Sequence, residues 1–359
     1  MLSAGNGFIM QSEKYSRDNA GQSLKKYILL KQGELAYNHG ASKAKQFGCC
    51  YELTGPEARI PYVYHCFKIN NHEYTPFIAM ALNNAKMDKQ LKRLVSSSVR
   101  MDGLLNISFE DYMSVTIHLP SPSEQKRIAD FLQKIDERIT AQEKLLASLK
   151  KYKRGVARTL LTPGSCCIEG ATWTTTKIGA LGSFTKGAPL SKADIAPDGT
   201  PFILYGELYT TYHEVINAVI RRTKAQPEKQ YYSHVGDVII PTSGETPEEI
   251  STAACVMLPD IILAGDLNIF RSSKIDGRIM SYILNHIVNG QIARIAQGKS
   301  VVHIQASELS KIEISYPDYN TQCKMISVFE AIATRIKSAE NELTYLRTMQ
   351  KALLQQLFI

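Results

Sequence analysis

The fold of this chain is decided by one stretch of sequence that occurs twice. Residues 120–161 read PSPSEQKRIADFLQKIDERITAQEKLLASLKKYKRGVARTLL, and residues 317–358 read PDYNTQCKMISVFEAIATRIKSAENELTYLRTMQKALLQQLF. A shift of 317 − 120 = 197 residues aligns the two copies without a gap and places Gln125 on Gln322. Such a repeat after each of two globular segments predicts a chain built as two pseudo-symmetric halves.

Both copies have the pattern of one long amphipathic helix. Ser121-Pro122-Ser123-Glu124 is a capping box with proline at the first helical position, and the same register puts Asp318 at the start of the second helix. Pro163-Gly164 is expected to end the first helix. Apolar residues recur in steps of three, four and seven, which is typical of a coiled-coil seam. About 39 residues at roughly 1.5 Å each give a helix about 58 Å long, too long for one small domain.

We therefore predict that the two helices pack antiparallel as a coiled coil, rather than lying as unrelated surface helices. The residues expected to pack at this seam are Ile128, Leu132, Ile135, Ile139, Leu146, Leu149, Met325, Phe329, Ile332, Ile336, Leu343 and Leu346.

The two globular segments also resemble each other. Gly33–Tyr37 corresponds to Gly236–Ile240, and a helical stretch from Phe77 to Val95 corresponds to one from Ile279 to Ala296. A short strand is expected after each, at residues 115–117 and 312–314. Each module is therefore predicted to be α+β with a curved, mostly antiparallel sheet. The second module opens at Trp173, 236 − 173 = 63 residues before its glycine, whereas only 32 residues precede Gly33, so the first module is expected to lack its opening half.

Composition narrows the class of protein. The chain has 359 residues, 44% of them hydrophobic and 21% charged, as in globular proteins, and no apolar run long enough for a membrane span. Seven cysteines, two pairs of them adjacent, favour free thiols in a reducing cytoplasm. His65-Cys66 fits a strand better than a metal site, and no metal site is predicted. A net charge of +8 favours a polyanionic partner such as nucleic acid.

Catalytic motifs are missing from the sequence. Gly290 and Gly298-Lys299-Ser300 end like a phosphate-binding loop, but seven residues separate the glycines where four are required. We find no Gly-x-Ser-x-Gly, His-Glu-x-x-His or Asn-Pro-Pro-Tyr motif. A chain of this size without a catalytic constellation is predicted to be a recognition or scaffold subunit.

Polar loops with Lys, Arg, Ser, Tyr or Gly are the candidate DNA contacts, because such side chains pair with phosphates or base edges. Any one of these lysines could instead be a solvated surface charge. Basic residues between Lys144 and Arg158 either complement the helix dipole or contact DNA or a partner. The candidate DNA-binding residues are Lys186, Gly187, Ser191, Lys192, Tyr205, Ser243, Lys299, Ser300, His303, Asn38, His39, Lys43, Lys45, Ser98 and Arg100.

Taken together, these stretches resemble the specificity subunit of type I restriction-modification systems. The resemblance rests on the proline-started helix from Leu119 to Leu132, its weaker repeat from Tyr316, and the opening Trp173…Lys177-Ile178-Gly179…Phe184…Gly187. Residues 11–38 look like the middle of another target recognition domain. The resemblance covers essentially the whole chain.

The resemblance implies a division of labour. Two target recognition domains each read one half of a split DNA sequence, and the paired helices set the spacing and dock two methyltransferase subunits. Those partners supply S-adenosylmethionine and adenine methylation, and a restriction subunit adds ATP- and Mg-dependent translocation and cleavage. This chain would itself be non-catalytic and hold no cofactor. The expected domains are residues 1–119, recognition domain 1; 120–162, first spacer helix; 163–172, linker; 173–316, recognition domain 2; and 317–359, second spacer helix.

Other readings stay open at this point. A truncated or silent variant would still bind methyltransferase subunits but read only one half-site. The short first module would then reflect a truncated or rearranged gene, or a start assigned too late. A coiled-coil scaffold without DNA binding and a free-standing nuclease or ATPase are the further alternatives.

Overall fold

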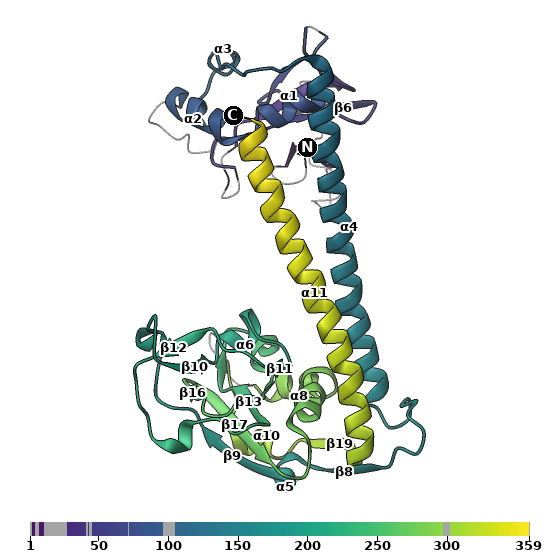
Figure 1. The fold of residues 1–359 in the computed structure, drawn as a ribbon, viewed down its shortest axis with the longest axis vertical. Helices are drawn as coiled ribbons and strands as arrows, with labels where there is room; N and C mark the ends of the chain where they lie inside the picture. Colours follow the sequence, from purple (N-terminus) through teal and green to yellow (C-terminus); the bar gives the residue numbers. More distant parts are fainter. Residues whose placement is uncertain are drawn as a thin grey trace. The chain divides into compact units, whose positions relative to one another are not determined.

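The chain forms two compact units. A computed structural model describes residues 2–3, 7–10, 27–40, 42, 45–70, 72–95, 105–296 and 302–358. Unit 1 comprises residues 1–144 and 340–359, and unit 2 comprises residues 145–339 (Figure 1). Each unit therefore contains one globular module together with part of both long helices, whereas the sequence set the helices apart as separate segments.

The two predicted long helices are α4 (Pro122–Leu160) and α11 (Tyr319–Leu357), each of 39 residues. They pack antiparallel, as predicted (Figure 1). Within unit 1, Arg138 binds Glu342 at 2.8 Å and Arg347 binds Glu143 at 2.6 Å across the pair. Every seam residue named from the sequence is buried or half-buried. The helix α4 ends at Leu160, two residues short of the predicted boundary.

Both helix starts are held by a carboxylate. Glu124 accepts hydrogen bonds from the backbone and the hydroxyl of Ser121, at 3.1 and 2.7 Å. Asp318 accepts from the backbone N–H groups of Thr172 and Thr321, both at 3.0 Å, and these bonds hold its pKa well below the usual range. The capping position predicted at Asp318 is confirmed.

Unit 1 is built around the strand β4 (Leu35–Asn38), which pairs antiparallel with strands on both sides. The buried side chains of Tyr37, Phe77 and Tyr112 form the centre of its core. The other elements of this unit are β1 (Leu2–Ser3), β2 (Gly7–Phe8), β3 (Ile28–Lys31), β5 (Cys49–Glu52), β6 (Glu57–Ile60), β7 (His65–Phe67), α1 (Thr75–Ala81), α2 (Ala85–Leu94) and α3 (Phe109–Met113). Its sheets are β1-β2, β3-β6 and β5-β4-β7.

Unit 2 has a five-stranded sheet in the order β11-β15-β13-β17-β9 and a three-stranded sheet in the order β12-β10-β16. The strands of these two sheets are β9 (Gly182–Lys186), β10 (Thr200–Leu204), β11 (Val215–Ile216), β12 (Arg221–Thr223), β13 (Asp237–Pro241), β15 (Ala254–Val256), β16 (Ile262–Ala264) and β17 (Leu267–Ser272). Two two-stranded sheets join β14 (Ser243–Gly244) to β18 (Val302–His303), and β8 (Trp173–Lys177) to β19 (Glu313–Pro317).

Short helices complete unit 2. The helix α8 (Gly277–His286) packs on β13 and β15 and is followed by α9 (Asn289–Ile295). The remaining helical turns are α5 (Ile178–Leu181), η3 (Lys192–Asp194), α6 (Glu207–Thr210), η4 (Lys229–Tyr231), α7 (Pro247–Ile250) and α10 (Ala306–Leu309).

The two modules contain equivalent backbone hydrogen bonds as well as a common sequence pattern. The Gly33 N–H donates to Leu53 O at 2.9 Å, and the Gly236 N–H donates to Val256 O at 2.8 Å. Both glycines have positive φ, +83° and +94°, a conformation that residues with a side chain rarely adopt. The glycines that open the central strands are therefore equivalent turn positions, in agreement with the sequence alignment.

Three details differ from the sequence prediction. Each predicted long module helix is two short ones, because Asn84 caps α2 by accepting from the backbone N–H groups of Lys86 and Met87, and residues 287–288 interrupt the second stretch. The predicted strand at residues 115–117 is not formed, because these residues pair with no strand within the described part of the chain. Its counterpart, predicted at residues 312–314, is confirmed as β19 (Glu313–Pro317), which begins one residue later and ends three residues later.

Candidate nucleic-acid interface

Three of the candidate DNA-binding residues of unit 2 line one cleft. It has a volume of about 380 Å³ and lies where β9 ends, beside the turn between β16 and β17. The residues that line it are Lys186, Gly187, Ala188, Pro189, Leu190, Ser191, Thr242, Gly265, Asp266 and Leu267. Lys186, Gly187 and Ser191 were predicted from the sequence, so the fold brings these positions together.

Lys186 is the cation of this cleft. Its Nζ donates to Asn268 Oδ1 at 2.8 Å and lies 3.5 Å from Thr242 Oγ1. Partial burial lowers the pKa of Lys186, although the nearby carboxylate of Asp266 opposes this change. The ammonium group is therefore held in place by neutral oxygens and partly desolvated, which is suitable for a directional contact with a ligand.

A second polar group lies beside it and contains two predicted residues. The Ser243 hydroxyl donates to Asp266 Oδ2 at 3.0 Å and lies 2.9 Å from His303 Nδ1. The strand pair β14–β18 sets Ser243 directly opposite His303. Hydroxyl, imidazole and carboxylate thus offer both donors and acceptors next to the lysine.

The loop after β9 is shaped by backbone geometry. A Cβ at Gly187 would lie 2.8 Å from Gly265 O and 3.1 Å from Leu263 O, so only glycine fits without a shift of the backbone. Ser191 caps the following turn through its bonds with Asp194, which leaves Lys192 exposed at the start of that turn. Tyr205, at the end of β10, lies against the Gly265 turn.

In unit 1 the described candidates lie partly inside the fold. Lys45 donates from Nζ to Asn83 O at 3.1 Å, and His39 is only 5% exposed. Asn38 accepts from the Gly40 N–H at 2.9 Å, which stabilises the turn after β4. These contacts are structural, and a role of these residues in DNA binding stays a prediction. Five other candidates lie outside the described residues: Lys43, Ser98, Arg100, Lys299 and Ser300.

Sequence reasoning missed two polar residues at this site: Asp266, which lines the cleft, and Asn268, which accepts a hydrogen bond from Lys186. Asp266 was overlooked because a carboxylate is not expected near phosphates, and Asn268 because it occurs within a predominantly apolar strand. The only available signal for Asp266 was its position after Gly265, a glycine with φ of +75° that turns the chain into β17.

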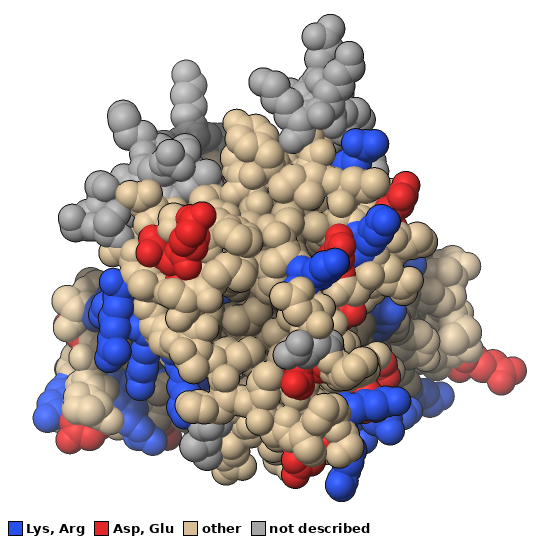
Figure 2. All heavy atoms as spheres, turned by 90° about the horizontal axis from the view of Figure 1, so that it is seen from above, with Lys and Arg blue, Asp and Glu red and all other residues tan. Residues whose placement is uncertain are grey.

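The net positive charge is not gathered in one broad patch on the face of unit 1 that Figure 2 presents. There, uncharged residues occupy most of the centre, and Lys and Arg side chains lie mainly in separate groups at the lower left and on the right, with Asp and Glu side chains near them. Within the described residues, no group of His, Cys, Asp and Glu is arranged to hold a metal ion. In that part of the chain, no helix is long and apolar enough to cross a membrane.

Residues 57–151 match the family described as type I restriction modification DNA specificity domain. No curated protein matches the sequence. The S subunit of a type I restriction-modification system from M. genitalium has a similar structure, with a TM-score of 0.58 at 15% identity over 93% of this chain and 85% of that one.

A second solved structure, which concerns complex assembly and conformational transition of the type I R-M system, contains a chain of similar fold. Its TM-score is 0.57 at 14% identity, over 92% of this chain and 82% of that one. At these identities the structural similarity establishes the fold: two long antiparallel helices with a β-rich domain in each half.

Proposed function

Because the chain belongs to the family of type I restriction-modification specificity subunits, which are non-catalytic, we propose that it reads a bipartite DNA target, one half-site for each unit. The cleft at Lys186 is the observation that carries this proposal for unit 2. It combines a held ammonium group, the hydroxyl of Ser191 and the Asp266 carboxylate, which accepts a hydrogen bond from the neighbouring Ser243 hydroxyl.

This set of groups suits base edges better than the phosphate backbone. A lysine donates to guanine O6 and N7, a carboxylate accepts from the cytosine amino group, and hydroxyls serve either base. A phosphate-binding surface would instead consist of cations, and Asp266 would weaken it by repulsion. We therefore assign the cleft to direct base readout. Other residues of unit 2, including exposed Lys192, would contact the backbone of the duplex.

The long helices are proposed to set the spacer between half-sites and to dock two methyltransferase subunits. Large apolar side chains are exposed along them, as docking to a partner requires. These side chains are Phe131, Leu145, Tyr152, Val328 and Tyr345, of which Tyr152 is 60% exposed and Tyr345 is 66% exposed. The partner subunits would bring S-adenosylmethionine for adenine methylation, and restriction subunits would bring ATP- and Mg-dependent cleavage. We place this complex in the cytoplasm.

Binding to duplex DNA tests the assignment of the cleft. The chain is purified with its methyltransferase subunit, and affinity for duplex DNA is measured over a range of salt concentrations. Lys186→Ala is expected to weaken binding to the target about tenfold or more, because one good base contact contributes about 1–3 kcal/mol. Lys224→Ala is the matched control, since this lysine of unit 2 is exposed and paired with Asp198 at 3.1 Å. Equal effects of the two substitutions would refute the readout role of the cleft.

A second candidate function is the variant that reads only one half-site. The observation in its favour is the smaller sheet of unit 1, in the order β5-β4-β7. In its counterpart in unit 2, β15-β13-β17, the strand β17 is followed in the sheet by β9, which ends at Lys186. No counterpart of β9 occurs among the described residues of unit 1. Methylation of a target with only one defined half would support this variant, and a motif defined in both halves would exclude it.

A further inference from the structure

In unit 2, the strand that precedes the long helix α11 has a partner strand. There, β19 pairs antiparallel with β8, with Ser315 opposite Thr175. The flanking bonds run from the Ile178 N–H to Ile312 O and from the Asp318 N–H to Thr172 O, both 2.9 Å. Because bonded residues alternate along an antiparallel pair, Ile314 and Tyr316 face β8 with their backbone groups.

The 197-residue shift places Ile117 on Ile314 and Leu119 on Tyr316. In unit 1, a side chain forms hydrogen bonds with the backbone along one edge of this segment. Gln90 donates to Thr116 O at 2.8 Å and accepts from the Thr116 N–H at 3.0 Å. On the other edge, the backbone groups of Ile117 and Leu119 have no hydrogen-bond partner within the described residues. Among the described residues, no segment of unit 1 occupies the edge that β8 occupies in unit 2.

A second strand edge of unit 1 also has no partner strand among the described residues. The strand β7 pairs with β4 in the register that β17 adopts with β13: Leu35 opposite Phe67, and Val238 opposite Phe270. In unit 2, β9 covers the far side of β17, whereas β7 is the last strand of its sheet among the described residues. The two strands that have no counterpart among the described residues of unit 1, β8 and β9, are consecutive in sequence and joined by the turn α5.

The side chains that β8 covers in unit 2 are more buried than their counterparts in unit 1. Ile314 is 2% exposed, whereas its counterpart Ile117 is only half-buried; Leu119 is 40% exposed, whereas its counterpart Tyr316 is half-buried. A cleft of about 580 Å³ lies against residues 116–120, and Phe77, Met87 and Phe358 are among the apolar residues that line it. In unit 2, Trp173 of β8 packs against the equivalent core.

We propose that unit 1 takes up an extended segment of a second polypeptide, which pairs antiparallel with Val115–Leu119 and continues onto β7. The internal copy defines its chemistry: residues 173–186 begin with an aromatic residue, continue with β-branched Thr174, Thr175 and Thr176, and turn after about five residues. The occupant is therefore the opening segment of another recognition module. In a second copy of this chain the same segment is already paired with β19, so the partner is a different polypeptide. Strand addition to an open edge supplies backbone hydrogen bonds, and the aromatic side chain supplies apolar contact.

A peptide from this chain is the probe. A fluorescently labelled peptide of residues 171–188 is titrated with the full chain, and binding is followed by anisotropy. The wild-type chain is expected to bind it saturably, and a peptide with Trp173→Ala about tenfold more weakly, since one large buried aromatic contributes about 1.5–3 kcal/mol. Amide exchange at Ile117 and Leu119 is expected to slow when the peptide is added.

Two proline variants of the same segment separate pairing from general damage. Leu119→Pro removes an N–H on the open edge, whereas His118→Pro removes one on the opposite edge, and both side chains are exposed. Peptide affinity is expected to fall at least tenfold in the first variant and to stay within about twofold in the second, because one lost strand bond costs about 1.4 kcal/mol or more when its acceptor is left unpaired. Absence of saturable binding to the wild-type chain, or equal binding to both variants, would overturn the proposal.

Discussion

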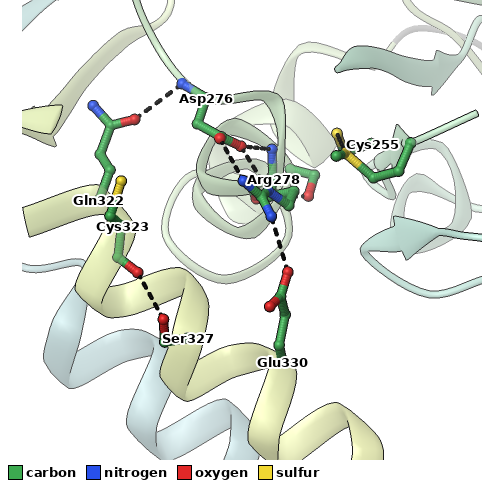
Figure 3. A network of polar contacts seen from close by, with 9 residues as sticks. Cys255, Asp276, Arg278, Gln322, Cys323, Ser327 and Glu330 are labelled. Atoms are coloured by element: carbon green, nitrogen blue, oxygen red, sulfur yellow. Dashed lines mark hydrogen bonds and ion pairs between the residues drawn. The ribbon is translucent and has the colours of Figure 1, made fainter. Parts of the chain in front are cut away.

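Gln125 and Gln322 make the same two backbone hydrogen bonds, each within its own unit. Gln125 donates to Pro120 O at 2.9 Å and accepts from the Tyr74 N–H at 3.0 Å. Gln322 donates to Pro317 O at 2.8 Å and accepts from the Asp276 N–H at 2.9 Å (Figure 3). Each side chain thereby ties the start of a long helix to the start of a module helix, since Tyr74 precedes α1 and Asp276 precedes α8.

Substitution of either glutamine is expected to destabilise its unit. Gln125 and Gln322 are 0% and 3% exposed, so alanine would leave a buried carbonyl and a buried N–H without partners. Each substitution is expected to lower the free energy of unfolding by about 1–3 kcal/mol. Chemical denaturation measures the change. Gln133→Ala, at an exposed position of α4, serves as the control and should change the free energy by less than about 0.5 kcal/mol.

A pair of asparagines gives a second test of the internal symmetry. Asn285 accepts from the Ala253 N–H at 3.1 Å and donates to Ala253 O at 2.7 Å, while Asn83 makes the same pair of bonds with Cys50. Asn285→Ala is expected to lower the free energy of unfolding by about 1–3 kcal/mol, because both backbone groups of buried Ala253, which directly precedes β15, lose their partner. Thermal melts of this variant and of the exposed control Asn217→Ala would show it. Equal melting temperatures would contradict the assigned role.

The stability of unit 2 is expected to depend on pH through Glu214. Burial raises the pKa of this carboxyl, but the hydrogen bond with His286 and the charge and hydrogen bond of Lys153 outweigh it and bring the pKa from 4.5 to about 2. A lowered folded-state pKa stabilises the fold above pH 4.5, and this contribution is lost as the pH falls from 4.5 towards 2. The loss is on the order of 3 kcal/mol.

The fluorescence of Trp173, the single tryptophan, can follow unfolding of unit 2 in urea at several pH values. Glu214→Gln removes the titrating group and is expected to flatten the dependence of stability on pH between 2 and 4.5. An unchanged pH profile in this variant would show that other carboxyl groups govern acid unfolding.

The spacer role of the helices predicts the effect of insertions. Residues 138–143 of α4 face residues 342–347 of α11, so four residues are inserted after Ala141 and four after Thr344. Four residues add about 6 Å to each helix, the length of roughly two base pairs. The methylated motif is expected to keep its two half-sites and gain about two base pairs between them. An unchanged spacer would disprove the role of the helices as a ruler.

The sequence was most informative where a repeat or a cap could be recognised. The 197-residue register predicted both long helices, the seam and the cap at Asp318, because helix periodicity is a local property of the chain. The strand β8 begins at Trp173, the residue at which the second module was predicted to open. The break at Asn84 was missed, because an asparagine in a helical pattern becomes a cap only when its side chain accepts from the next turn.

The cleft could be predicted only in part. Lys186, Ser191 and Ser243 were recognised as polar loop residues, but their proximity results from pairings between distant strands. Asp266 and His303 meet at Ser243 because β14 pairs with β18 and β16 turns into β17. Nothing local in the sequence specifies these pairings. In contrast, Lys45 has the same local signature as Lys186, yet it donates to the backbone of Asn83 inside unit 1.

The most direct test of the central claim is a map of methylated adenines in a host that co-expresses this chain with its methyltransferase subunit. The account predicts a split motif with defined bases in both halves, and a Lys186→Ala variant that relaxes or abolishes one half while Lys224→Ala leaves the motif unchanged. A stable complex that yields no motif, or a motif that is insensitive to Lys186, would contradict it.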